Sequence, residues 1–303
     1  QVLGAMSGKS LTAQQLGGAE EMMKQGACAL VAADENAALA MAVKLLDYLP
    51  SCNAEGTEVE ESDDLNRLLP ALDAADAEVV MNALLDNGTM VELYAGYETS
   101  VRVAMGRMGG RSVGVVATEG KNLTAGALAK AARFVRFMDC YSLPIISLVN
   151  TQGVCVTSVS EQAELMKAQS QLLYAYAEAT CPKLCVVTGD AIGQAYVAMG
   201  GTANADVTYA WPTATISALT PEAAVAVLYG DKVAQDKELS VEAAREKYAA
   251  EYVSEVAGAI HAAKAGLIDD VIEPAQTRML LIAALAMLAA KRDSNPPKKH
   301  GNL

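Results

Sequence analysis

The sequence predicts an α/β domain in which helices are layered on a sheet. Helical and strand patterns alternate through its middle, with helices at about 125–141 and 160–180 and short apolar strands at 144–149 and 183–188. Of the 303 residues, 52% are hydrophobic, which is enough to bury a full core. Regular alternation of the two element types favours a layered α/β arrangement.

The N-terminal quarter divides into a helical part and an acidic part. From Ser10 to about Tyr48 apolar and alanine residues recur at helical spacing, and Pro50 ends the pattern. The stretch 52–64 contains GTEVEESDD, a composition typical of an exposed linker. We therefore expect a domain boundary here, which divides the chain into 1–50, 51–75 and 76–303.

Further elements follow from the same patterns. A helix is expected at 73–85, a strand at 90–94, and two alternating strands around 101–105 and 112–117, joined by RMGGR, whose glycines are typical of a hairpin. Helices are expected at 221–229, 241–263 and 276–291.

Composition limits the classes of function. The net charge of −13 argues against a nucleic-acid or anionic-membrane surface, because phosphates would be repelled. The six cysteines form no CxxC pair and are expected to be reduced, mostly buried thiols. Neither a signal peptide nor an apolar run of membrane length is visible, so the cytoplasm is the expected compartment.

Histidine chemistry is not expected. His261 and His300 are the two histidines, so a histidine-based triad lacks its parts, and no metal site is expected from them or from the unclustered cysteines. Any chemistry must depend on backbone dipoles or on groups supplied by a bound molecule.

The stretch from Gly189 to Leu219 carries the strongest functional signal. Lys183 to Thr188 (KLCVVT) is expected to be a buried strand, and the turn Gly189 to Gly193 then opens a helix of small residues. The first amides of a helix have no partner inside it, and the helix dipole adds to them. A developing negative charge would be stabilised there without an ionisable side chain.

Extended blocks of this chain resemble the carboxyltransferase subunit of biotin-dependent acyl-CoA carboxylases and decarboxylases. These blocks, in the family's order, are KAARFVRFMDCYSLPIISLVN (130–150), LLYAYAEATCPKLCVVT (172–188), YAWPTATISAL (209–219), AGLIDDVIEPAQTR (265–278) and PPKKHGNL (296–303). The resemblance implies a crotonase-like fold, a spiral of ββα units, which periodicity alone does not distinguish from a doubly wound sheet.

The resemblance also assigns the three segments of the chain to domains of the family. Residues 1–50 correspond to the end of the family's N-terminal carboxyltransferase domain, 51–75 to an acidic linker, and 76–303 to the C-terminal carboxyltransferase domain. The earlier part of the N-terminal domain, which holds the acyl-CoA thioester oxygen, has no counterpart here. Either the chain is a fragment or another chain supplies that half, and an oligomer is expected because the family's cleft lies between subunits.

By resemblance, two oxyanion holes made of main-chain amides stabilise the thioester enolate and the biotin enolate. The family's biotin-side turn, Gly-Gly-Ala-Tyr, corresponds to Gly193, Gln194, Ala195 and Tyr196. We expect the amides of Gln194 and Ala195 to be the catalytic donors, with Gly193 and Tyr196 contacting the cofactor. If the turn requires positive φ at Gln194, that side chain costs about 1 kcal/mol.

Two further positions bear on substrate and cofactor. Val197 stands where carboxylases of the family commonly carry Asp and methylmalonyl-CoA decarboxylases an aliphatic residue, so it either lines the acyl end of the substrate or fills core. The loop Asn150 to Ser158 (NTQGVCVTS) stands where the family shapes its biotin channel, and it keeps only Gly153, which we assign to cofactor binding. Asn150 replaces an acid, and both family prolines are missing.

Two other groups have open interpretations. Lys130, Arg133 and Arg136 fall three apart on a predicted helix, either as a local patch for the anionic CoA or as a solvated or subunit-facing stripe. Tyr209 and Trp211 either pack their strand against the 189–193 turn, which we expect, or contact the substrate directly.

The sequence therefore predicts a carboxyltransferase acting between carboxybiotin and a short-chain acyl-CoA. The expected partners are a biotin carboxyl carrier protein, which carries the biotin, the acyl-CoA, and either further copies of the chain or a chain that supplies the N-terminal half. The alternative is a non-catalytic crotonase-fold assembly subunit, favoured by the altered 150–158 loop.

Overall fold

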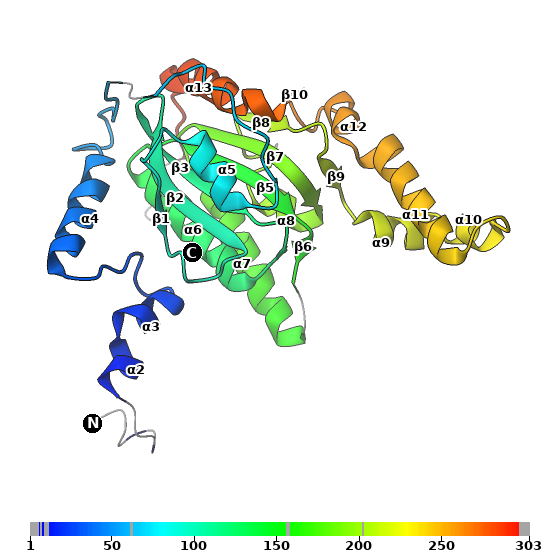
Figure 1. Ribbon diagram of the computed structural model, residues 1–303, viewed down its shortest axis with the longest axis horizontal. Helices are drawn as coiled ribbons and strands as arrows, with labels where there is room; N and C mark the ends of the chain where they lie inside the picture. The colour runs from blue at the N-terminus through cyan, green and yellow to red at the C-terminus, as the bar shows by residue number, and fades with distance from the viewer. Residues whose placement is uncertain are drawn as a thin grey trace.

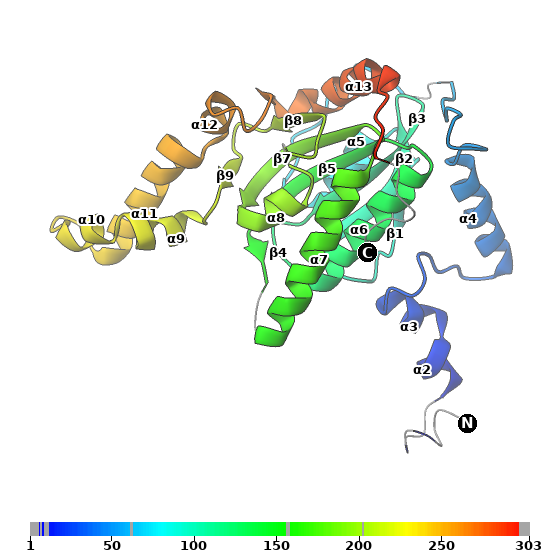
Figure 2. The same ribbon diagram turned by 180° about the vertical axis from the view of Figure 1, so that it is seen from behind.

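The computed structural model describes residues 6, 8, 12–60, 63–155, 158–201 and 203–296. Figures 1 and 2 show a central sheet with helices on both faces. Helices of the N-terminal part and a helical arm near 221–264 extend to opposite sides of this centre (Figure 1).

Eight of the described strands form one mixed sheet in the order β1-β2-β3-β5-β7-β8-β10, with β9 paired to β7. Their bounds are β1 Val91–Leu93, β2 Val101–Met108, β3 Arg111–Thr118, β5 Ile145–Thr151, β7 Lys183–Ile192, β8 Val207–Ala210, β9 Thr215–Ser217 and β10 Asp270–Val271. Strands β1 to β3 are antiparallel, and the pairings from β3 onward are parallel. A separate parallel pair joins β4 Asn122–Leu123 to β6 Gly153–Val154.

Side chains of the central strands alternate between two cores. On β3, Val116 belongs to one core and Val115 to the other, and on β5 Ile145 and Ile146 divide in the same way. The first core is covered by α6 Ala125–Cys140 and α7 Val159–Glu178, and the second by α5 Ala77–Leu84 and α13 Thr277–Met287. Because strands buried on both faces need helices on both faces, the predicted layered α/β class is confirmed.

The local signals for the β2–β3 hairpin and for the two long helices are also confirmed. Gly109 and Gly110 form the hairpin turn with φ of +57° and +76°, a backbone that favours glycine. Thr124 caps α6 by accepting from the amide of Ala127, and Ser158 caps α7 by accepting from the amide of Glu161.

The helical pattern over 10–48 is divided among several helices. The described part of this stretch holds three helices, α2 Ala13–Gly17, α3 Ala19–Lys24 and α4 Glu35–Asp47, while Leu11 lies outside the described residues. The break between the first two falls at Gly18, whose extended backbone (φ −64°, ψ 144°) ends α2 and begins α3. Gly26, at φ +70°, follows the end of α3. Glycines therefore interrupt a periodicity that is otherwise helical.

A single helix over 241–263 is wrong. It divides into α11 Val241–Tyr252, a π-helical turn Val253–Ala257 and α12 Ala259–Lys264, because Gly258 adopts an extended backbone (φ −69°, ψ 156°). The predicted helix at 221–229 is confirmed as α9 Pro221–Leu228, and α10 Gly230–Gln235 follows it. The predicted last helix, 276–291, is confirmed as α13 with a short 3₁₀ turn after it, Leu288–Ala290.

The described part of the acidic segment 51–75 is irregular and mostly exposed, and it contacts the sheet. The amide of Val59 donates to the carbonyl of Gly110 (3.1 Å), and the guanidinium of Arg107 donates to the carbonyl of Thr57 (2.9 Å). The stretch around 57–59 therefore lies against the β2–β3 hairpin. The domain division at 51–75 stays a prediction.

All six cysteines are unpaired, but the expectation that most are buried is wrong. Cys181 and Cys185 are buried, whereas Cys52, Cys140 and Cys155 are exposed. Burial raises the pKa of the Cys185 thiol to about 12, so this thiol stays protonated at neutral pH.

Candidate active site

The strand before the candidate site is longer than its apolar run indicates. β7 does not end at Thr188 but continues to Ile192, because Asp190, Ala191 and Ile192 pair in parallel with β9. The predicted turn at 189–193 is therefore strand up to Ile192. Helix α8 Gly193–Ala198 begins directly at the strand end, and Ile192 provides no side-chain cap for it.

Gly193 is the residue at which the chain changes direction. Its φ is +56°, and a Cβ at this position would lie 3.1 Å from the carbonyl oxygen of Ala218. Gln194 lies inside α8 with ordinary helical backbone, so the cost expected from positive φ at Gln194 does not arise. The left-handed position coincides with the glycine that the sequence retains.

The four site residues of α8 differ in accessibility. Gln194 is exposed and Val197, one turn later, is 49% exposed, so Val197 does not fill core. Ala195 is 0% exposed, and its amide is covered by neighbouring atoms. Tyr196 is half-buried, and its ring lies against Gly201, where a Cβ would come within 2.9 Å of the ring.

Gly153 lies close to this helix. It is the first residue of β6, which packs beside α8, and its φ is +124°. The structure thus brings together the two elements that carry the predicted cofactor residues. Val156 and Thr157 of the same loop lie outside the described residues.

Two side chains near the site have roles that sequence reasoning missed. Asp190, on β7, accepts a hydrogen bond from the side-chain amide of Gln152, on the β5–β6 connection. Asn150 is 7% exposed, and its side-chain oxygen accepts from the amide of Asp190 (3.0 Å). Both contacts depend on the register between β5 and β7, which the sequence pattern does not predict.

Trp211 does not pack against the start of α8, so that expectation is wrong. Its indole is buried in the core on the opposite face of the sheet, and Nε1 donates to Thr277 Oγ1 on α13 (2.9 Å). Tyr209 packs partly against the same core. Because residues two apart on a strand share a face, both side chains lie on the α13 side.

The three basic residues of α6 do not form one exposed stripe. Lys130 is 5% exposed, and its ammonium donates to the carbonyls of Tyr97 (2.6 Å) and Glu98 (3.1 Å). Burial lowers the pKa of Lys130 to about 8. Arg133 and Arg136 are exposed and line a shallow hollow between α6 and α7, and Arg133 also lies over the Tyr94 ring.

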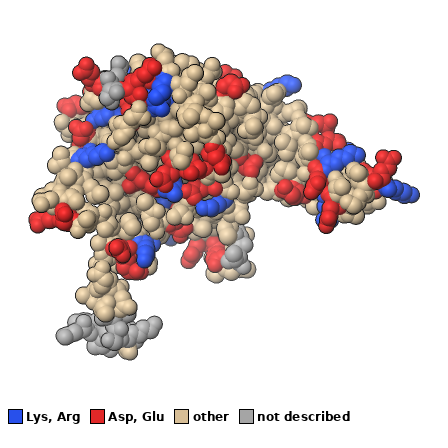
Figure 3. Space-filling view, viewed as in Figure 1, with Lys and Arg blue, Asp and Glu red and all other residues tan. Residues whose placement is uncertain are grey.

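Acidic side chains form a band across the middle of the face shown in Figure 3. Some of the acidic residues are paired: Arg102 forms ion pairs with Glu78, Glu92 and Glu119. The exposed arginines of α6 are therefore a small cationic area on a chain of strongly negative net charge.

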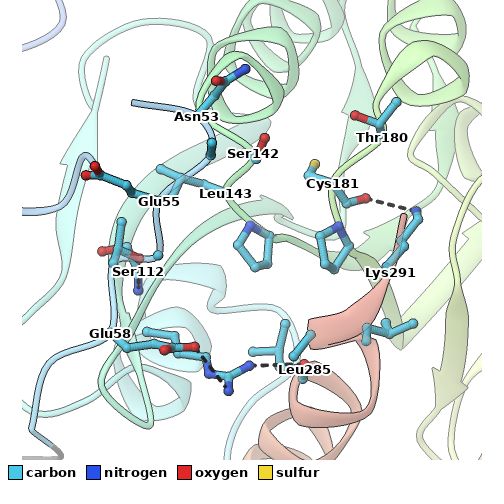
Figure 4. Close-up of a pocket in the computed structure, with 18 of the residues that line it drawn as sticks. Asn53, Glu55, Glu58, Ser112, Ser142, Leu143, Thr180, Cys181, Leu285 and Lys291 are labelled. Atoms are coloured by element: carbon cyan, nitrogen blue, oxygen red, sulfur yellow. Dashed lines mark hydrogen bonds and ion pairs between the residues drawn. The ribbon is translucent and has the colours of Figure 1, made fainter. Parts of the chain in front are cut away.

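A cavity of about 530 Å³ lies at the other end of the parallel strands (Figure 4). It is lined by residues at the starts of β3, β5 and β7 and by the acidic segment, including Glu58, Ser112, Leu143, Cys181 and Lys291. Gly193 follows the carboxyl end of β7, so this cavity is not part of the α8 site.

Neither a membrane span nor a metal cluster is found among the described residues. None of their helices combines the length and apolar character that a membrane crossing requires. Within the same ranges, no three His, Cys, Asp or Glu side chains are grouped so that they could hold a metal ion.

The fold belongs to a known class. The structure superimposes on the crystal structure of transcarboxylase 12S with a TM-score of 0.90 and 36% identity, covering 100% of this chain and 61% of that one. A single-chain, multi-domain long-chain acyl-CoA carboxylase, 22% identical, shares the fold with a TM-score of 0.76. The architecture is therefore the crotonase-like carboxyltransferase fold.

Sequence comparison gives the family. The sequence-family model described as the carboxyl transferase domain matches residues 1–303 of this chain. The chain therefore belongs to the carboxyl transferase domain family. It is 38% identical to the carboxyltransferase subunit of propionyl-CoA carboxylase from Haloferax mediterranei and 34% identical to the alpha subunit of methylmalonyl-CoA decarboxylase from Propionigenium modestum. Both matches cover 100% of this chain and 61% of the relative, so the chain spans about three fifths of their length.

Proposed function

We propose that this chain is the biotin-side part of a carboxyltransferase that moves a carboxylate between carboxybiotin and a short-chain acyl-CoA. Its membership of the carboxyl transferase domain family supports the class of reaction. The main support for the site is the geometry at the start of α8. There Gly193, with positive φ, places the exposed Gln194 at the end of a central strand.

The chain's own contribution is positional. The backbone amide of Gln194 donates to the oxygen on which charge develops, and Gly193 allows a ligand to approach the backbone closely. The amide of Ala195 is the second donor, and it becomes available when the atoms that cover it move. One such donor contributes roughly 3 kcal/mol to lowering the barrier.

The residues present fit a biotin headgroup on one side of the site. Gly153 of β6 and Tyr196 of α8 are the remaining cofactor-binding residues of the proposal, on two elements that pack together. When bound, the biotin ureido group supplies the nitrogen that carries the carboxylate. The protein supplies backbone amides and the shape of the site.

The acyl end of the substrate is assigned to Val197. This side chain is half-exposed on the same helix, one turn beyond Gln194, where it can contact a branched acyl group without introducing a charge. The transcarboxylase 12S structure contains methylmalonyl-CoA, and the Propionigenium modestum relative is a methylmalonyl-CoA decarboxylase subunit. Both favour a short branched acyl-CoA.

The carboxyltransferase acts together with partners. Biotin arrives on a biotin carboxyl carrier protein, and the acyl-CoA site is completed by an N-terminal carboxyltransferase domain, of which 1–50 is the final part and 51–75 the linker to 76–303. The transcarboxylase 12S relative is described as a hexamer, which supports an assembly of several copies.

One observation favours the alternative, a non-catalytic assembly subunit of the same fold. Ala195 has no exposed surface, so one of the two proposed donors is covered in this structure. A chain that no longer binds biotin does not need an accessible backbone amide at Ala195.

A decarboxylation assay separates the two functions. The complete protein is incubated with methylmalonyl-CoA or malonyl-CoA, with and without free biotin, and the decarboxylated acyl-CoA is quantified. Biotin-stimulated turnover of either substrate supports the carboxyltransferase. Absence of biotin-stimulated turnover with every short acyl-CoA tested supports the assembly subunit.

A further inference from the structure

We propose that Asn150 is a positioning residue that holds the end of β7, and with it the start of α8, in place. This inference is based on the geometry at the end of β7. The effect of Asn150 on catalysis rests on the proposed function. Asn150 lies on β5, the neighbour of β7 in the sheet.

The β5–β7 pairing is irregular at Asn150. Val149 pairs with Val187 and Thr151 pairs with Ala191, so 188–190 on β7 stand opposite the single residue Asn150. A bulge of this kind interrupts the ladder of backbone hydrogen bonds and redirects the strand that contains the extra residues. Some other group must then satisfy the amides of the bulged segment.

The Asn150 side chain supplies that group. Its Oδ1 accepts from the amide of Asp190 (3.0 Å), and its Nδ2 donates to the carbonyl of Ala74 (2.9 Å) in the segment before α5. An amide side chain is suited to this place because it accepts on one side and donates on the other. The bulge is thus anchored to two separate parts of the chain.

The backbone of Asn150 is fixed as well. Its amide donates to Thr118 Oγ1 (2.7 Å) at the end of β3, and its carbonyl accepts from the amide of Gly120 (2.7 Å). Gly189 lies so close that a Cβ there would be 2.6 Å from Asn150 Oδ1. Asn150 therefore has little room to move relative to β7, and Gly189 must remain a glycine.

The distance along the chain from this anchor to the site is short. Asp190 is three residues before Gly193, and the intervening residues belong to β7 and are paired with β9. A shift of Asp190 is therefore passed to the first amides of α8. Displacement of a catalytic group by about 1 Å can cost on the order of 10²-fold in rate.

Three variants test the role. Asn150→Leu keeps approximate size but removes both side-chain hydrogen bonds, whereas Asn150→Asp keeps the acceptor for the Asp190 amide. Ser147→Ala is the matched control, since Ser147 is also a buried polar residue of β5, with its hydroxyl paired to that of Tyr176 (2.7 Å). It removes a buried hydrogen bond from the same strand without touching the bulge.

The first readout is hydrogen exchange of the 189–198 segment in the complete protein, which requires no activity. We expect exchange to become about tenfold faster in Asn150→Leu, since one hydrogen bond that protects the segment is lost. Exchange should stay near the original rate in Ser147→Ala. It should rise less in Asn150→Asp than in Asn150→Leu, because the carboxylate keeps the acceptor for the Asp190 amide but cannot donate to the Ala74 carbonyl. Unchanged exchange in Asn150→Leu, or an equal increase in Ser147→Ala, overturns the proposal.

The second readout is biotin-dependent turnover. We expect kcat to fall on the order of 10²-fold in Asn150→Leu with little change in KM for the acyl-CoA, and Asn150→Asp to recover part of that loss, since it keeps one of the two hydrogen bonds. Faster exchange with unchanged kcat overturns the link to catalysis. If the unaltered protein shows no biotin-stimulated turnover, the proposed function fails, and exchange alone still decides the role of Asn150.

Discussion

Arg278, on α13, and Asp86, in the segment between α5 and β1, form a buried ion pair. The Nη2 to Oδ1 distance is 2.5 Å, and the two side chains are 0% and 1% exposed. The Asp86 carboxylate also accepts from the amides of Gly109 and Gly110, so it holds the hairpin turn as well. One carboxylate thus fixes two elements that are far apart in sequence.

Removal of this carboxylate is expected to destabilise the fold strongly. Asp86→Asn removes the nearer of two carboxylates paired with the buried Arg278 guanidinium, leaves Asp63 at 3.7 Å, and directs an amide group toward donors, at a cost of about 3 kcal/mol. Denaturant unfolding followed by the fluorescence of Trp211, the single and buried tryptophan, measures the loss. Glu58→Gln, which breaks the more exposed Arg111–Glu58 pair, is the control and should cost less than about 1 kcal/mol. Equal costs for the two variants would refute the role given to Asp86.

The lowered pKa of Lys130 should make the free energy of unfolding depend on pH. Burial lowers its pKa from 10.5 to about 8, so between these values the folded protein has released a proton that the unfolded chain still holds. The free energy of unfolding should therefore rise with pH in this window, relative to Lys130→Met, by about 2 kcal/mol between pH 7.5 and 10. Unfolding curves of both proteins measure the difference, in which groups common to both cancel. A constant difference across the window would contradict the lowered pKa.

Much of the fold could be predicted from the sequence. The central strands and the helices α6 and α7 follow from apolar runs and helical periodicity, which are strong where both faces of the sheet are buried. The ends of elements were less predictable. β7 continues through Gly189 and Asp190, which are poor strand residues, because β9 supplies a partner that is distant in sequence.

The candidate site shows the same division between local and long-range information. Gly193 could be predicted because a chain reversal before a helix needs a glycine, and its φ of +56° agrees. The contacts of Asn150 with Asp190 and Ala74 could not be predicted, since they depend on the register between strands. The covered amide of Ala195 likewise depends on packing from other elements.

Gly193 is expected to resist substitution. Gly193→Ala forces a residue with a Cβ into φ of +56° and brings that carbon within 3.1 Å of the Ala218 carbonyl oxygen. We expect a loss of about 1 kcal/mol or more and reduced turnover. Gly230→Ala is the control, because Gly230 opens α10 and a Cβ added there would meet no atom within 4 Å, and it should be neutral or slightly stabilising. Thermal unfolding measures both variants. Equal melting temperatures for Gly193→Ala and Gly230→Ala would contradict the requirement for glycine at position 193.

Val197 is expected to influence substrate choice rather than stability. Because its side chain is 49% exposed, Val197→Asp should change the free energy of unfolding by no more than about 0.5 kcal/mol. The introduced carboxylate should lower kcat/KM for methylmalonyl-CoA relative to malonyl-CoA, since an apolar contact with the branched methyl group is lost. If the ratio of kcat/KM for methylmalonyl-CoA to that for malonyl-CoA is unchanged, Val197 does not contact the acyl group.

The backbone amide of residue 194 is the central group of the proposed site, and proline can delete it. Gln194→Pro removes the N–H in the first turn of α8, where proline is tolerated, and Gln194→Ala removes the same side chain while it keeps the N–H. The measurement is kcat for biotin-dependent decarboxylation of methylmalonyl-CoA by the complete protein carrying each variant. We predict a loss on the order of 10²-fold or more for the proline variant and near-normal turnover for the alanine variant. Equal turnover in two folded variants would contradict the claim that this amide stabilises the developing charge.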